Sequence, residues 1–253
     1  MEYRTIRDIL TNAEKCFGNE DAIRYKIGKN EIAAKTYTQL KEDSERITAL
    51  LKKLEESKCH IALIGATSYL WIASYFGIVD GGNVAVPLDM SLPAEELCEL
   101  IDRADVTILI LDEIRKDVIE AAKEKCPKLK YILSMQKEAN EGNILSLTKS
   151  MMEQTIDEDT GAEKTDITPE QLCTIMFTSG TTGKSKGVML THRNLVENAT
   201  CLDMKLPERN VLLSVLPIHH ALPEYGYPER NFSRCNYLYQ RLFDACGEKY
   251  QII

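Results

Sequence analysis

The sequence predicts an α/β fold in which parallel strands are flanked by helices. Between residues 61 and 133, short apolar segments typical of buried strands alternate with longer segments of helical periodicity. The chain has 253 residues, of which 44% are hydrophobic and 28% charged, so it can bury a sizeable core. Strands that are apolar on both faces and separated by helices are expected to form a parallel sheet covered on each side.

The alternation begins with a helix at residues 36–54, for which Thr38 is the expected N-cap. Strands are then expected at residues 61–64, 84–86, 106–111 and 131–133, and helices at residues 68–80, 93–104 and 113–125. Pro87 is expected to end the second of these strands, because proline lacks an N–H donor.

Residues 61–79 carry no charged side chain and approach the length of a membrane-spanning helix. Gly65, Thr67 and Ser68 interrupt this window and separate a strand-like part from a part with helical spacing. The window is therefore interpreted as a buried strand–helix pair. The N-terminus lacks the apolar segment of a signal peptide, and we expect a cytoplasmic protein without a transmembrane segment.

Residues 136–170 are rich in Glu, Lys, Thr, Asn and Asp, with one short amphipathic stretch at residues 145–152. We interpret them as a surface connection between a first α/β subdomain, residues 1–135, and a second one that starts with residues 171–220. In the second part, strands are expected at residues 172–177, 188–190 and 211–216, and Thr191 is expected to cap a helix.

Charge and cysteine spacing exclude several classes of protein. The formal net charge is -8 and no segment gathers Lys and Arg, so a nucleic-acid partner is excluded. The eight cysteines form no C-x-x-C pair, and none has a histidine at zinc-ligand spacing. Their irregular spacing in a long chain also disfavours a disulfide framework, and reduced thiols are expected.

The loop after the strand at residues 172–177 carries the strongest functional signal. It reads Thr178, Ser179, Gly180, Thr181, Thr182, Gly183, Lys184, Ser185, Lys186 and Gly187. Its three glycines let the backbone turn sharply and point N–H groups into one concavity. Hydroxyl groups add donors and the two lysines add positive charge, so the loop suits a polyphosphate. A solvated, idle hairpin turn seldom combines these features. We name residues 178–187 the phosphate loop.

A Walker A loop is the rival phosphate-binding interpretation. Gly183, Lys184 and Ser185 match its last three positions, but its first glycine would fall at Thr178. A Walker A loop also opens directly into a helix, whereas Gly187 and an apolar, strand-like triplet follow here. The P-loop NTPase is therefore the weaker alternative.

Residues 177–195, FTSGTTGKSKGVMLTHRNL, closely resemble the phosphate-binding signature of the adenylate-forming superfamily. That superfamily includes acyl-CoA synthetases, the adenylation domains of peptide synthetases and firefly luciferase. Residues 61–89 resemble a region that these enzymes carry upstream, and residues 216–220 resemble their next motif downstream. The three blocks cover residues 36–220 and look most like a long-chain fatty acid–CoA ligase. Ser185 departs from the pattern, because many members have proline at its position.

The resemblance implies the N-terminal subdomains of the adenylate-forming fold, in incomplete form. It also implies a role in fatty acid metabolism. In the implied reaction a small-molecule carboxylic acid attacks the α-phosphate of ATP, pyrophosphate is released, and Mg²⁺ bridges phosphate oxygens. CoA then displaces AMP from the acyl-adenylate to give a thioester. The phosphate-binding residues would be Thr178, Ser179, Gly180, Thr181, Thr182, Gly183, Lys184 and Gly187. Thr181 would also contact Mg²⁺ through the nucleotide. Lys186 and His220 would be catalytic: the lysine would offset phosphate charge, and the histidine would lie beside the carboxylate and the α-phosphate.

Two alternatives to a CoA ligase remain open at this point. One is an adenylating module that loads the thiol of a carrier protein. The other is a non-catalytic ATP-binding protein that retains the loop. The identity of the acid and its chain length are not fixed by these residues.

The resemblance ends at His220. Residues 221–253 contain crowded tyrosines and two prolines, and they show neither helical nor strand periodicity. Family members are roughly twice as long as this chain. We therefore expect a truncated or frame-shifted product whose tail is not native to the fold, with a genuine but divergent ending as the alternative. Such a chain is expected to show no turnover alone, and to form dimers or larger species through an exposed apolar face.

Overall fold

The computed structural model describes residues 3–27, 31–55, 58–136, 140, 144–155, 165–178, 185–200, 210–212 and 250–252. These residues belong to two compact units. The larger unit comprises Asp43–Ile167 and Gln171–Leu190, and the smaller comprises Met1–Glu42, Thr168–Glu170 and Thr191–Ile253. Strands on both sides of residues 136–170 share the sheet of the larger unit. The division into subdomains at those residues stays a prediction about a complete enzyme.

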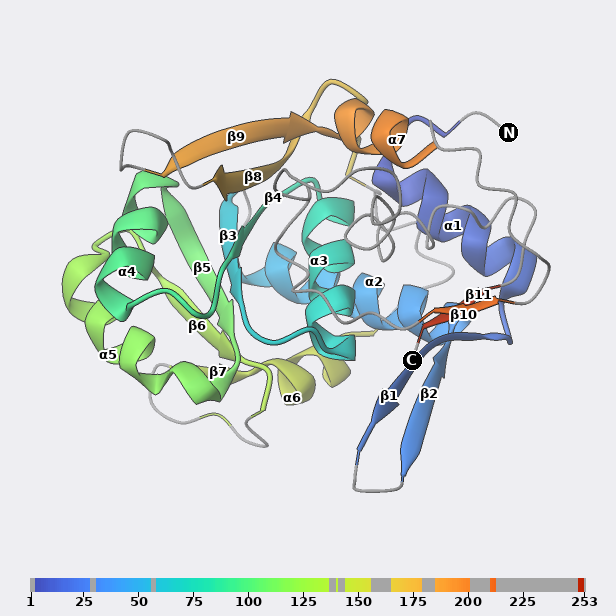
Figure 1. The fold of residues 1–253 in the computed structure, drawn as a ribbon, viewed down its shortest axis with the longest axis horizontal. Coiled ribbons are helices and arrows are strands. Elements are labelled where there is room, and N and C mark those ends of the chain that lie inside the picture. The colour runs from blue at the N-terminus through green and yellow to red at the C-terminus, as the bar shows by residue number, and fades with distance from the viewer. Residues whose placement is uncertain are drawn as a thin grey trace, which may run out of the picture. The chain divides into compact units, whose positions relative to one another are not determined.

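The larger unit is built on a seven-stranded sheet (Figure 1). Its strand order is β7 (Ile144–Ser146), β6 (Tyr131–Ser134), β5 (Val106–Leu111), β3 (His60–Ile64), β4 (Val84–Leu88), β8 (Leu172–Thr178) and β9 (Lys186–Thr191). All pairs from β7 to β8 are parallel. This confirms the predicted parallel sheet. Figure 1 shows β9 returning alongside β8 in the opposite direction.

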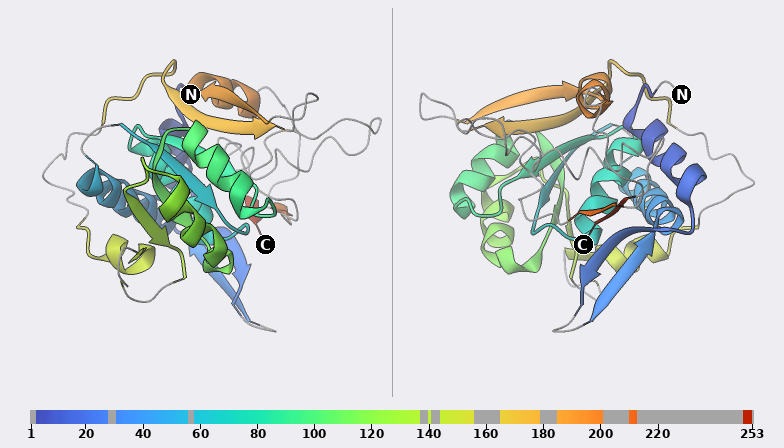
Figure 2. Two further views of the ribbon diagram at one scale, coloured as in Figure 1. Left: turned by 90° about the vertical axis from the view of Figure 1, so that its left-hand side faces the viewer. Right: turned by 45° about the vertical axis from the view of Figure 1, so that its right-hand side comes forward.

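Helices cover both faces of this sheet (Figure 2). On one face, α4 (Ala94–Arg103) and α5 (Lys116–Lys125) pack against side chains such as Ala62 and Ile64. On the other face lies α3 (Tyr69–Asp80), joined by α2 (Tyr37–Leu54). The two helices approach closely, because a Cβ at Gly77 would lie 2.7 Å from the Ile47 side chain. A short helix, α6 (Leu147–Met152), follows β7.

The apolar window at residues 61–79 forms β3 and α3, as predicted. Ser68 caps α3 by accepting a hydrogen bond from the Trp71 N–H. Ten residues of this twelve-residue helix are buried. Its hydrophobic sequence is therefore explained by burial around the whole helix. Among the described residues, no helix has the length and hydropathy needed to cross a membrane.

Two predicted boundaries are wrong. β4 continues through Pro87, which pairs with Leu63 of β3. Proline fixes φ within the range of extended backbone. It ends a strand only where a neighbouring strand requires a hydrogen bond from the N–H that proline lacks. β8 pairs with β4 at Ala85, before the proline. The cap of α2 is Thr36 rather than Thr38: its hydroxyl accepts from the Gln39 N–H, and the Gln39 side chain accepts from the Thr36 N–H. This reciprocal pair is a capping box.

Three short elements of the larger unit, a 3₁₀ turn, a strand and a helix, were not predicted individually from the sequence. The predicted helix at residues 113–125 begins with a 3₁₀ turn, Glu113–Arg115, capped by Asp112. The amphipathic stretch at residues 145–152 proves to be the edge strand β7 and the helix α6. A three-residue strand is too short for alternation in the sequence to reveal it.

The smaller unit contains three elements between residues 6 and 36 that the sequence analysis had not predicted. They are α1 (Ile6–Phe17), β1 (Asp21–Lys26) and β2 (Ile32–Thr36). α1 begins with a capping box between Thr5 and Asp8, and α7 (His192–Thr200) packs against it. The predicted cap of α7 is confirmed: the Thr191 hydroxyl accepts from the Asn194 N–H, and the Asn194 side chain accepts from the Thr191 N–H.

The four-stranded sheet of the smaller unit has the order β10 (Asn210–Leu212), β11 (Tyr250–Ile252), β1 and β2. β11 is the part of residues 221–253 that the structure describes, and it pairs in parallel with β10 and β1. That the tail is not native to the fold stays a prediction.

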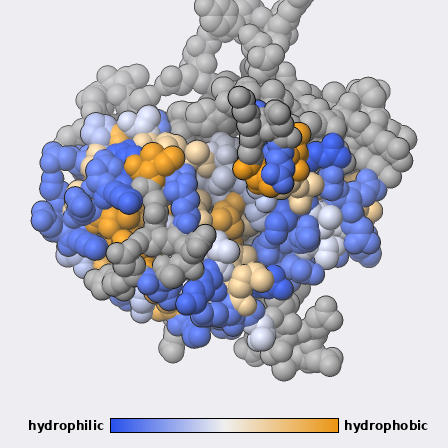
Figure 3. Space-filling view, turned by 90° about the horizontal axis from the view of Figure 1, so that it is seen from below, coloured by the Kyte–Doolittle hydropathy of each residue, from blue (hydrophilic) through white to orange (hydrophobic). Residues whose placement is uncertain are grey.

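Exposed large hydrophobic side chains are distributed over several elements. Among the described residues they are Ile27, Ile32, Ile114, Met152, Val188 and Met189. On the face drawn in Figure 3, hydrophobic residues form separate patches among hydrophilic ones. Self-association through a single apolar face stays a prediction.

Candidate phosphate-binding site

The strand that leads into the phosphate loop is rooted in the core. Residues 173–176 of β8 are buried, and the Thr174 hydroxyl lies 2.9 Å from the Tyr75 hydroxyl of α3. Burial of the Cys173 thiol raises its pKa to about 12. These contacts fix β8 up to Met176. Phe177 is half-buried, and Thr178 at the end of the strand is exposed.

The beginning of β8 is held by the turn between α3 and β4. The Gln171 amide donates to the Gly82 carbonyl at 2.8 Å, and its oxygen accepts from the Lys58 ammonium at 2.9 Å. Gly82 has φ +74°, and a Cβ there would lie 2.9 Å from Thr165 Cγ2. Only glycine meets both conditions without strain. The glycine at position 82, which belongs to the upstream family block of residues 61–89, therefore has a structural explanation.

Two of the predicted site residues meet where the hairpin strands enter the phosphate loop. Thr178 is the last residue of β8 and Lys186 is the first of β9. The Thr178 hydroxyl donates to the Lys186 carbonyl at 3.5 Å. Both side chains are exposed, so a hydroxyl donor and an ammonium group are accessible together. This pairing suits an anionic ligand.

Gly187 lies within β9 rather than in a turn, which changes the reason for a glycine there. A Cβ at this position would lie 3.2 Å from Ile175 Cγ2 and 3.4 Å from Phe177 Cε1. Gly187 therefore lets β9 approach β8 closely. The sequence had attributed this glycine to sharp turning of the backbone, and that attribution is wrong.

A residue that the sequence did not single out, Arg103, contacts β8 and the residue that precedes β9. It is the last residue of α4, and its Nη2 donates to the Ser185 carbonyl at 2.8 Å. Its guanidinium carbon lies 5.6 Å from the centroid of the Phe177 ring. Arg103 and Ser185 are 82 positions apart in the sequence, so no local pattern could have indicated the contact.

The remaining predicted residues lie outside the described part of the chain. They are Ser179, Gly180, Thr181, Thr182, Gly183, Lys184 and His220. Their roles stay predictions, as does the contact of Thr181 with Mg²⁺.

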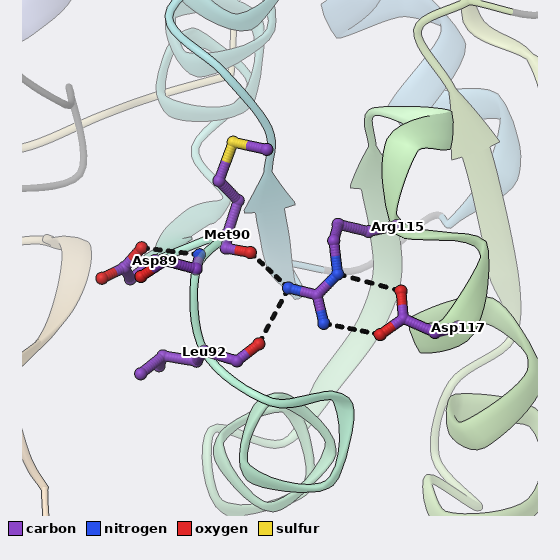
Figure 4. A network of polar contacts seen from close by, with 6 residues as sticks. Asp89, Met90, Leu92, Arg115 and Asp117 are labelled. Atoms are coloured by element: carbon purple, nitrogen blue, oxygen red, sulfur yellow. Dashed lines mark hydrogen bonds and ion pairs between the residues drawn. The ribbon is translucent and has the colours of Figure 1, made fainter.

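A second arginine fixes the loop that follows β4 (Figure 4). Arg115 donates to both carboxylate oxygens of Asp117, at 2.9 and 2.7 Å, and to the carbonyls of Met90 and Leu92. The hydrogen bonds from Arg115 lower the pKa of the Asp117 carboxyl below its ordinary value. A planar guanidinium can satisfy a carboxylate and two carbonyls at once. The carboxyl end of β4, which belongs to the upstream family block, is thereby tied to the segment after β5.

Comparison with known proteins places this geometry in context. The chain matches the model of the AMP-binding enzyme family over residues 11–226. It is 23% identical over 219 residues to a long-chain-fatty-acid–CoA ligase of Thermus thermophilus, covering 85% of this chain and 39% of that protein. It is 27% identical over 188 residues to a D-alanine–D-alanyl carrier protein ligase of Streptococcus equi, covering 72% of this chain and 33% of the relative.

The fold is also similar to that of solved structures. The anthranilate CoA ligase AuaEII, crystallised with anthranoyl-AMP, superposes with a TM-score of 0.78 at 20% identity. That superposition covers 99% of this chain and 45% of the ligase, so the chain spans under half the length of these relatives. The similarity confirms the predicted fold, the N-terminal part of adenylate-forming enzymes. Because the family model matches most of its length, the chain belongs to the AMP-binding enzyme family.

Proposed function

We propose that this chain carries the polyphosphate-binding part of an enzyme that activates a carboxylic acid with ATP. The observation that carries the proposal is the junction of Thr178 and Lys186, which presents a hydroxyl and an ammonium group where a core-anchored strand enters the phosphate loop. The family match supports the same chemistry, since its model spans this junction.

The proposed reaction joins two anions. A carboxylate oxygen attacks the α-phosphorus of ATP, the bond between the α-phosphorus and the bridging oxygen breaks, and pyrophosphate leaves. Because the approach is repulsive and charge builds on the leaving group, catalysis consists of positioning and neutralisation. In the proposal, Lys186 and Lys184 offset charge on the β- and γ-phosphates. The hydroxyl of Thr178 donates to a phosphate oxygen when it turns from the Lys186 carbonyl.

Further residues act in the proposal through their positions in the family motifs. The backbone N–H groups of Ser179, Gly180, Thr182 and Gly183 bind phosphate oxygens. Thr181 would contact Mg²⁺ through the nucleotide, and the ion would supply neutralisation of phosphate charge. His220 orients the carboxylate beside the α-phosphate.

CoA is the proposed acceptor of the acyl group. Its thiolate attacks the acyl carbon, the bond to the adenylate oxygen breaks, and AMP leaves. The similarity to a long-chain-fatty-acid–CoA ligase favours this acceptor and a fatty acid substrate. The similarity to a D-alanine–D-alanyl carrier protein ligase favours a second candidate, transfer to the thiol of a carrier protein.

The first test is isothermal titration of the purified chain with Mg·ATP, Mg·pyrophosphate and AMP. Binding through the phosphate loop predicts that Mg·ATP and Mg·pyrophosphate compete and that AMP alone binds much more weakly. Lys186→Ala is expected to lower the affinity for Mg·pyrophosphate by about tenfold, the effect of losing one charged hydrogen bond. Lys26→Ala, which removes an exposed lysine from β1, is the matched control.

The second test concerns the reaction. The protein encoded by the whole gene is expected to exchange labelled pyrophosphate into ATP only when a carboxylic acid is added. ATP binding without acid-dependent exchange would favour a non-catalytic ATP-binding protein, and release of ADP would favour the NTPase alternative. Transfer assays with CoA and with a phosphopantetheinylated carrier protein separate the two acceptors.

A further inference from the structure

We propose that Arg103 is a positioning residue that holds the two ends of the phosphate loop in register. This inference rests on the proposed function, because it assigns Arg103 a part in nucleotide binding that it performs without touching the nucleotide. Arg103 lies on α4, far in sequence from the hairpin that it contacts.

The geometry places one guanidinium group against the end of β8 and the backbone just before β9. Its Nη2 reaches the carbonyl of Ser185, the residue that precedes β9, at 2.8 Å. Its carbon atom lies 5.6 Å from the ring centroid of Phe177, near the end of β8. Arg103 therefore contacts the last half-buried residue before the phosphate loop and the residue before β9.

Arginine is suited to this double contact. A charged donor strengthens the hydrogen bond to a carbonyl, and the face of the planar group can lie over an aromatic ring at the same time. Glu99, one turn earlier on α4, lies 3.6 Å from Nη1, but both side chains are exposed, so this ion pair contributes little to the orientation of the guanidinium. A lysine would keep the charge but would lose the planar group.

The contact restrains a backbone that would otherwise be free to vary. Serine at position 185 allows the ordinary range of negative φ, whereas a proline would fix φ near -65°. On the other strand, Phe177 also packs 3.4 Å from the position of a Cβ at Gly187. Fixing Ser185 relative to Phe177 orders the loop ends before a ligand binds, and such preorganisation raises affinity by reducing the entropy lost on binding.

The solvent exposure of Arg103 limits how strongly it can restrain the hairpin. The Arg103 side chain is 38% exposed, so solvent screens its interactions and the restraint is modest. We expect Arg103→Ala to increase the rate of tryptic cleavage after Lys186 about three- to tenfold, because cleavage requires local opening of the strand. Cleavage after Lys53, an exposed lysine of α2, serves as an internal reference and is expected to stay unchanged.

Glu99→Gln is the matched control, because it removes the ion pair of Arg103 on α4 while leaving both loop contacts in place. Wild-type cleavage rates in this variant support the proposal, and an increase equal to that of Arg103→Ala would assign the effect to α4 instead. Equal acceleration at Lys186 and Lys53 in Arg103→Ala would indicate global destabilisation and overturn the positioning role.

The affinity of the Arg103 variants for Mg·ATP tests whether the contact affects nucleotide binding. Arg103→Ala is expected to weaken binding about three- to tenfold, and Arg103→Lys is expected to fall between the alanine variant and the wild type. A lysine variant with full wild-type affinity would show that charge alone matters and would contradict positioning. If the wild-type chain does not bind Mg·ATP, the proposed function fails, while the tryptic rates still decide whether Arg103 restrains the hairpin. If the wild-type chain binds and Arg103→Ala binds equally well, the inference fails and the proposed function stands.

Discussion

β8 and β9 are neighbours in one sheet, yet their surroundings are opposite. Residues 173–176 of β8 are buried, whereas residues 186–189 of β9 are exposed, Met189 by 69%. The first strand is positioned by the core and the second by pairing with β8 and by the contact of Arg103 with Ser185. A binding loop between such strands combines a fixed side with an adjustable one. The predictions below test that contrast by substitutions at buried and exposed positions of the hairpin and its contacts.

The largest effect is expected from a matched pair of methionines. Met176 on β8 is 6% exposed, and Met189 on β9 is 69% exposed. Met176→Ala removes buried apolar atoms and leaves a cavity, so it should lower the free energy of unfolding by about 2–5 kcal/mol. Met189→Ala should change it by less than about 0.5 kcal/mol. Urea denaturation followed by circular dichroism measures both, and similar losses in the two variants would refute the contrast.

A smaller effect is expected where β8 is hydrogen-bonded to α3. Thr174→Val keeps the shape but removes the hydroxyl that lies 2.9 Å from the Tyr75 hydroxyl, and should cost about 1–3 kcal/mol. Tyr75→Phe removes the same contact from the other side. A double-mutant cycle measured by urea denaturation should give a coupling energy of about 1 kcal/mol. Additive losses would mean that the two hydroxyls stabilise the fold independently.

The pH dependence of stability provides a third comparison. Burial raises the pKa of Cys173 on β8 to about 12, above its ordinary value of 9.0. A raised pKa means that the stabilisation is complete below pH 9 and is lost as the pH rises toward 12, because the unfolded chain releases its proton first. At pH 10 the loss from this thiol is on the order of 1 kcal/mol. Cys173→Ala should flatten the decline between pH 8 and pH 10 by that amount, and an unchanged slope would contradict the assignment. Cys126, with a pKa raised to about 12, adds its own decline and is unaffected by this substitution.

The smallest effect on stability is expected at the exposed end of the hairpin. The hydrogen bond from the Thr178 hydroxyl to the Lys186 carbonyl is long, at 3.5 Å, and exposed to water. Thr178→Val should therefore change the melting temperature by no more than about 2 °C. Differential scanning calorimetry measures it, with Thr174→Val as the buried counterpart. A loss as large as that of Thr174→Val would mean that the junction of the strands is part of the core.

The sequence predicts most of the larger unit because its signals there are local. The strand at residues 106–111 is found with its expected bounds, since an apolar run between two polar turns specifies both ends. Thr191 is confirmed as a cap because a capping residue acts within one helical turn. The prediction that Pro87 ends the strand was wrong because the cost of its missing N–H depends on whether a neighbouring strand requires that hydrogen bond. The pairing of strands is not a local property of the sequence.

The candidate site divides in the same way. The composition of the phosphate loop is visible in the sequence, and the structure places Thr178 and Lys186 together as a hairpin requires. The need for glycine at position 187 and the contact of Arg103 with Ser185 depend on packing between segments. Such contacts leave no trace in the spacing of residue types, so a sequence-based interpretation cannot supply them.

The strand order of the large sheet has a consequence for a chain that is still being synthesised. β3 to β7 leave the ribosome first and can assemble through successive crossovers, whereas β8 must join beyond β4, at the opposite side of the sheet from β7. Until that happens, β4 is an edge strand, although all five of its residues are buried in the folded protein. An unpaired apolar edge of this kind invites pairing with other chains. β8, which leads into the phosphate loop, thus also covers an apolar edge of the sheet.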